Sequence, residues 1–61
     1  MISSGELAKL PDDHLDGAYV MIIKVVPGYV HNGWVNVLVV RSDGSRSKML
    51  AQRINGKLIA I

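Results

Sequence analysis

From Ala18 onward the hydrophobic positions follow a period of two and β-branched residues are frequent, which is the pattern of half-buried strands. Three dipeptides divide this stretch, and each suits a two-residue type I′ hairpin turn because its residues tolerate positive φ: Asn32-Gly33, Asp43-Gly44 and Asn55-Gly56. The sequence therefore predicts a mainly β fold, a four-stranded antiparallel meander with strands at about 18–31, 34–42, 45–54 and 57–61. Proline donates no ladder hydrogen bond, so Pro27-Gly28 predicts a bulge or bend and an edge position for the first strand.

The N-terminal residues have a different pattern. Ser3 and Glu6 have the spacing of a capping box, Leu7 and Leu10 share a helical face, and Pro11 ends the run, which predicts a short helix at about 4–10. Residues 11–17 fit one more helical turn or a loop equally well. We expect a single domain over 1–61, with a short helix and acidic leader at 1–17 and the meander at 18–61.

Two-residue turns would fix the register of the strands and hence the neighbours of each side chain. They would set Arg41 opposite Arg46 and Trp34 opposite Arg53. One face would then carry the expected core, covered by Leu7, Leu10 and Leu15: Val30, Val35, Val37, Val39, Leu50, Ile59 and Ile61. The other face would carry Tyr29, His31, Trp34, Leu38, Val40, Met49, Leu58 and Ala60.

Two apolar faces are more than one short helix covers, which favours self-association through the second face. The expected interface is Leu38, Val40, Met49 and Leu58. The alternative is that the sheet curls into a small barrel and buries both faces. A short N-terminal helix followed by curved antiparallel strands resembles, in element order, the Sm-like and SH3-like small barrels.

Composition limits the function classes. A 61-residue chain buries only about 60% of its unfolded surface, so its stability is marginal without a supplement. The absence of cysteine excludes disulfides and thiolate zinc sites and leaves oligomerisation. The longest apolar run, Ala18–Ile23, is too short to span a membrane, so we expect a soluble, cytoplasmic protein.

Charge is unevenly distributed along the chain. Residues 1–17 hold four acids and one lysine, a net −3, whereas residues 18–61 hold six cations and one acid, a net +5. On this basic sheet, Arg41, Arg46 and Lys48 are candidate phosphate contacts, although a solvated hairpin tip is the simpler explanation of these charges. Tyr29, Trp34 and Arg53 are candidate base contacts, and they also suit a protein hot spot or a cluster that only stabilises the hairpin.

No catalytic, cofactor or metal motif is present, so we expect no enzyme. The cluster Asp12, Asp13, His14 and Asp16 fits neither a calcium loop nor a zinc pattern. The preferred hypothesis is a homo-oligomeric β-module that binds nucleic acid. The alternative is a protein-interaction or inhibitor module of the kind that phages and plasmids use to block a host protein.

Overall fold

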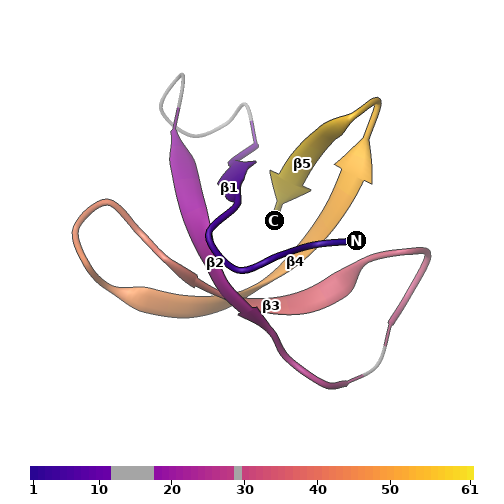
Figure 1. Cartoon of the computed structure of the whole chain (residues 1–61), viewed down its shortest axis with the longest axis horizontal. Coiled ribbons are helices and arrows are strands. Elements are labelled where there is room, and N and C mark those ends of the chain that lie inside the picture. Colours follow the sequence, from indigo (N-terminus) through magenta and orange to yellow (C-terminus); the bar gives the residue numbers. More distant parts are fainter. Residues whose placement is uncertain (12–17, 29) are drawn as a thin grey trace.

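The computed structural model describes residues 1–11, 18–28 and 30–61, and these form a small closed β-barrel (Figure 1). The mainly β prediction is confirmed, and the small barrel given as the alternative agrees with the structure. The predicted meander of four strands is wrong, because a fifth strand near the N-terminus closes the sheet in the order of the strands along the chain. The strands are β1 (Leu7–Lys9), β2 (Tyr19–Val25), β3 (Val35–Val40), β4 (Arg46–Ile54) and β5 (Lys57–Ala60).

β1 closes the barrel. It pairs antiparallel with β2 and parallel with β5, where Lys9 lies across from Ile59. β2 therefore has a neighbour on both sides, and its predicted edge position is wrong. The register of β2 against β3 shifts between Ile22 and Lys24, so the bulge lies earlier than Pro27-Gly28, which follows the end of the strand.

The N-terminal helix predicted for residues 4–10 is wrong. In its place, Leu7 is 61% exposed, whereas Ala8 is fully buried and Leu10 is 8% exposed, which is the alternation of a strand. Half of the predicted capping box does form, because the Ser3 N–H donates to a Glu6 carboxylate oxygen. A helix of about two turns is unstable alone, whereas these residues gain ladder hydrogen bonds as a strand. The possible second helical turn and Leu15 lie outside the described residues.

Two of the three predicted turns are confirmed. Asn32 and Gly33 have φ of 52° and 81°, and Asn55 and Gly56 have 52° and 78°, as a type I′ turn requires. The bridge between His31 and Trp34 and the pairing of Ala51 with Ala60 match the predicted register.

The turn between β3 and β4 differs from the prediction by one residue. The Gly44 N–H donates to the Arg41 carbonyl at 2.9 Å, and the Arg41 N–H donates to the Ser45 carbonyl at 2.8 Å. Only Gly44 has positive φ, at 87°, so the connection has three residues, Ser42 to Gly44. Asp43 favours this form because its Oδ1 accepts hydrogen bonds from the Ser45 N–H and hydroxyl.

The additional loop residue shifts the register by one, so the side chains of β4 and β5 that were predicted to face the core face outward, and the others face inward. Val39 pairs with Ser47 and Val37 with Met49, where the two-residue turn would have set Lys48 and Leu50. Leu50, Ile59 and Ile61 therefore point outward rather than into the core, and Val30 is exposed as well.

The barrel interior is entirely aliphatic among the described residues. Each strand contributes inward side chains, and together they form one cluster: Ala8, Leu10, Val20, Ile22, Val37, Val39, Ala51, Leu58 and Ala60. The three alanines, on β1, β4 and β5, are fully buried, which lets the strands close around a narrow interior.

Within the described ranges, no helix is long and apolar enough to cross a membrane.

Candidate nucleic-acid interface

The outer face of β2, β3 and β4 carries three exposed cations. Lys24 on β2 and Lys48 on β4 both pair with Leu38 on β3, so the three side chains form one row across the sheet. Val40 pairs with Arg46 in the adjacent row. Neighbouring strands lie about 4.8 Å apart and a strand rises about 3.3 Å per residue, which sets Lys24 about 10 Å and Arg46 about 7 Å from Lys48. We call Lys24, Arg46 and Lys48 the cationic face.

The acids of the described residues are engaged elsewhere. Glu6 pairs with Arg53, and Asp43 bonds to Ser45 at the β3–β4 turn. The side-chain and backbone hydrogen bonds of Ser45 hold the pKa of Asp43 below its ordinary value. No residue of the cationic face forms an ion pair with another part of the described chain. Its charges are therefore available to an anion from outside.

Arg41 does not lie opposite Arg46, so the predicted pair of opposed arginines is wrong. Its Nε donates to the Ser47 hydroxyl at 3.3 Å, and the residue is partly buried. Ser47 pairs with the buried Val39, whereas Arg46 pairs with Val40, whose side chain points outward. The two arginines consequently extend to different faces of the hairpin, and only Arg46 belongs to the cationic face.

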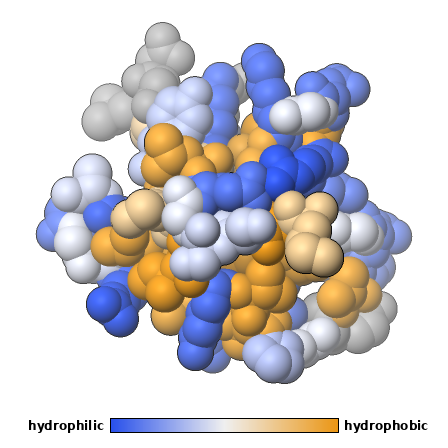
Figure 2. All heavy atoms as spheres, viewed as in Figure 1, coloured by the Kyte–Doolittle hydropathy of each residue, from blue (hydrophilic) through white to orange (hydrophobic). Residues whose placement is uncertain are grey.

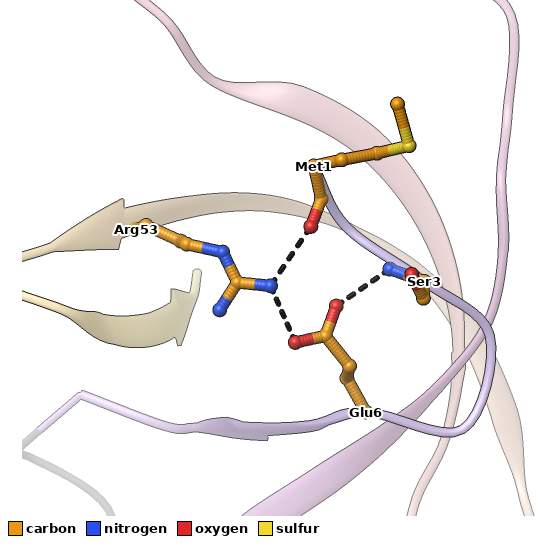
Figure 3. A network of polar contacts seen from close by, with 4 residues as sticks. All are labelled: Met1, Ser3, Glu6 and Arg53. Carbon is orange, nitrogen blue, oxygen red and sulfur yellow. Dashed lines mark hydrogen bonds and ion pairs between the residues drawn. The ribbon is translucent and has the colours of Figure 1, made fainter.

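Arg53 is held by the N-terminal segment (Figure 3). Its Nη2 donates to the Met1 carbonyl at 2.8 Å and to the carboxylate of Glu6. The hydrogen bond from Arg53 is the main cause that holds the pKa of Glu6 below its ordinary value, and the Ser3 N–H lowers it further. The predicted pairing of Arg53 with Trp34 is wrong, because Val35 pairs with Ala51 and the β3–β4 register is therefore shifted by one residue.

Trp34 directly precedes β3 and follows the Asn32-Gly33 turn. Its N–H donates to the His31 carbonyl at 2.9 Å. Since Val35 pairs with Ala51, the same register continued by one residue sets Trp34 across from Gln52. Tyr29, the other aromatic of the predicted base-binding set, lies outside the described residues.

The predicted oligomer interface is divided between two environments. Leu38 and Val40 lie on the outer face and are partly buried, and their part in an interface stays a prediction. Leu58 is only 6% exposed and belongs to the core, and Met49 packs against it. Their assignment to a surface is therefore wrong.

Sequence reasoning missed an exposed apolar row on β1 and β2. Leu7 pairs with Met21, and they are 61% and 43% exposed, while Tyr19, two residues before Met21, is 49% exposed. No clear signal marks this row in the sequence, because residues 7–10 do not alternate between apolar and polar, and only the pairing of β1 with β2 brings Leu7 beside Met21. On the side of the molecule seen in Figure 2, apolar residues reach the surface between hydrophilic side chains.

The fold and the cationic face define the structural class of the protein. It is a five-stranded closed β-barrel with an aliphatic interior and a cationic outer face. Compared with known protein families, curated proteins and solved structures, the chain matches none of them. No group of three or more His, Asp or Glu side chains that could hold a metal occurs among the residues described. The cluster at Asp12, Asp13, His14 and Asp16 lies outside that part of the chain.

Proposed function

We propose that this protein is a non-enzymatic β-module that binds nucleic acid through the phosphate backbone. The observation that carries the proposal is the row in which Lys24 and Lys48 flank Leu38, with Arg46 beside it and no described acid on that face. Lysine and arginine on an exposed surface are the usual contacts to phosphate oxygens, and such contacts orient the protein without reading sequence. Arg46 and Lys48 remain from the set predicted from sequence, and Lys24 joins them.

The number of phosphate contacts has a measurable consequence. Each neutralised phosphate releases condensed counterions, so the binding constant falls with salt. Three contacts predict a slope of log Kobs against log salt of about −2 to −3. A few contacts of this kind give weak, sequence-independent binding, which is the behaviour we expect at physiological salt.

Fluorescence anisotropy of a labelled oligonucleotide, measured over a range of salt concentrations, tests the proposal. The variant Lys24→Gln/Arg46→Gln/Lys48→Gln should lose most of the binding. Lys57→Gln is the matched control, because Lys57 is an exposed cation on β5 and lies outside the cationic face. Absence of binding at low salt, or equal losses from the control and the triple variant, would refute the proposal.

The second candidate function is protein binding, and the exposed row of Leu7, Met21 and Tyr19 favours it. Exposed apolar side chains that are neighbours on a sheet are a common feature of protein interfaces. The partner is either a second copy of this chain, since a small barrel gains stability from association, or a host protein. Binding of a host protein that is abolished by Met21→Glu and retained in the triple charge variant would favour this candidate over nucleic acid.

A further inference from the structure

The outward side chains of the β3–β4 hairpin change character along its length. Val37 and Val39 are fully buried and Val35 packs against the core, so the alternate residues of β3 face outward. In order, the outward residues are Trp34, Asn36, Leu38 and Val40. Across from them on β4 lie Gln52, Leu50, Lys48 and Arg46. One end of the outer face therefore carries an indole and two amides, and the other end carries cations.

The indole end of this face is fixed by backbone and side-chain hydrogen bonds. Trp34 closes the type I′ turn through its bond to His31, and the Gln52 amide donates to the Asn32 carbonyl at 3.0 Å. Trp34 is not one of the described hydrophobic residues that pack against the core cluster. Trp34 is thus a large, partly buried aromatic side chain on a hydrogen-bonded hairpin, and it is not part of the core of the barrel.

The length of the β3–β4 face suits an extended single strand of nucleic acid. The six residue steps from Trp34 to Val40 cover about 20 Å, at about 3.3 Å per residue. Single-strand-binding β-barrels commonly cover about 4 to 16 nucleotides, combining a positive track for the backbone with aromatic side chains on which bases stack. The β3–β4 face supplies both parts along one line.

We propose that the ligand of this face is a single-stranded nucleic acid that lies along the β3–β4 hairpin. One base stacks on Trp34, beside the amides of Asn36 and Gln52, while the phosphates that follow contact Lys48, Arg46 and Lys24. Duplexes keep the faces of their bases stacked on one another, so only an unpaired strand offers a base to the indole. This inference rests on the proposed function and specifies its substrate class.

The intrinsic fluorescence of Trp34 provides the test, because it is the only tryptophan of the chain. Three probes are titrated: an oligodeoxythymidylate of about 12 nucleotides, a duplex of the same length, and inorganic polyphosphate. The single strand should quench the fluorescence as it binds. Polyphosphate, which has no bases, should compete with the oligonucleotide for the cationic face without comparable quenching, and the duplex should bind more weakly and leave the indole unquenched.

Substitution of the indole supplies the second measurement. Trp34→Ala should weaken binding of the labelled single strand by about 5-fold to 150-fold, the range for loss of one base–aromatic stack, and leave polyphosphate binding unchanged. Trp34→Phe, which keeps a ring, should recover part of the affinity. Tyr19→Ala is the matched control, since it removes an exposed aromatic from β2, outside the β3–β4 face. Circular dichroism establishes that each variant is folded, and polyphosphate binding gives an independent readout for Trp34→Ala.

The outcomes separate the two proposals. Equal affinity for single strand and duplex, together with unchanged single-strand affinity in Trp34→Ala, overturns the single-strand inference while phosphate binding stands. Failure of all three probes to bind overturns both. A loss of single-strand affinity in Tyr19→Ala as large as that in Trp34→Ala would also contradict the assignment of this face.

Discussion

The guanidinium of Arg53 on β4 is ion-paired with the carboxylate of Glu6, which directly precedes β1. The same guanidinium nitrogen bonds the Met1 carbonyl, so one side chain fixes the N-terminal segment to the barrel (Figure 3). Within this segment, Ile2 packs against the core cluster. The ion pair therefore stabilises the placement of β1, the strand on which closure depends.

The first prediction concerns pH. The pKa of Glu6 in the folded protein is below its ordinary value of 4.5, so its contribution to stability is fully present above about pH 4.5 and is lost as pH falls through the folded pKa. The free energy of unfolding, measured with urea at a series of pH values, should fall in this acidic range. Glu6→Gln should be less stable at neutral pH and should show a shallower acid loss.

Asp43 provides the comparison for this experiment, because its pKa is also lowered, by Ser45. Asp43→Asn should remove a separate part of the acid dependence, and the double variant should flatten it further. An acid profile of Glu6→Gln identical to that of the unmodified protein would contradict the role of the Arg53 ion pair.

The second prediction concerns the narrow interior. Ala51 and Ala60 are paired across β4 and β5 and both are fully buried. Ala51→Leu should destabilise the barrel by about 1–3 kcal/mol, the usual cost of forcing extra methylenes into a packed core. Thermal or urea unfolding measures the change. Lys57→Leu, an outward substitution on the adjacent strand, should change stability little, and an equal loss there would contradict the explanation.

The third prediction compares two glycines with positive φ. Gly44, at 87°, has open space where a Cβ would lie, so Gly44→Ala should cost only the backbone strain of about 1–2 kcal/mol. At Gly33, at 81°, an added Cβ would lie 2.5 Å from Nε2 of Gln52, so Gly33→Ala should cost more. Urea unfolding of the two variants should rank them in this order, and equal losses would show that the Gln52 side chain moves aside freely.

The fourth prediction separates the arginines of the β3–β4 hairpin. Arg46→Gln should weaken oligonucleotide binding and reduce the salt slope by about 1, because it removes one phosphate contact. Arg41→Gln should have a smaller effect, since the Arg41 guanidinium bonds Ser47 and lies on the other face. Anisotropy titrations at several salt concentrations compare them. A larger effect from Arg41 would restore the hairpin tip as the phosphate site.

The fifth prediction concerns self-association. Light scattering at high micromolar concentration should give a mass above that of the monomer, and Met21→Glu should return it to the monomer by placing a charge in the exposed row of β1 and β2. Ile61→Glu is the control, because Ile61 is 52% exposed but forms backbone hydrogen bonds with Leu50 of β4, outside the exposed row of β1 and β2. A monomeric mass for the unmodified protein would refute the prediction.

Local chemistry predicted much of the fold. Asn-Gly turns require positive φ at both residues, so the turns at Asn32 and Asn55 and the pairing of Ala51 with Ala60 followed from sequence. The helix prediction was wrong because it placed Leu7 and Leu10 on one face, whereas in the strand they lie on opposite faces, and the hydrogen bonds of this segment to β2 and β5 override its local helical pattern.

The candidate site was harder to predict, since it depends on long-range register. Asp43-Gly44 fits turns of two or three residues, and Ser45 favoured the longer one through its bonds to Asp43. Lys24 could not be assigned to the cationic face from sequence, because the bulge between Ile22 and Lys24 determines the face on which it lies.

The Ser42 to Gly44 connection also has a consequence for how this protein tolerates length changes. A slip of β4 by one residue against β3 would drive Lys48 and Arg46 toward the interior and release Leu58 and Ala60 to water, so the buried face holds the register. A residue inserted into this exposed connection should therefore lengthen the loop and leave the pairing of Val40 with Arg46 in place. The connection is thus a position at which the barrel should accept added residues.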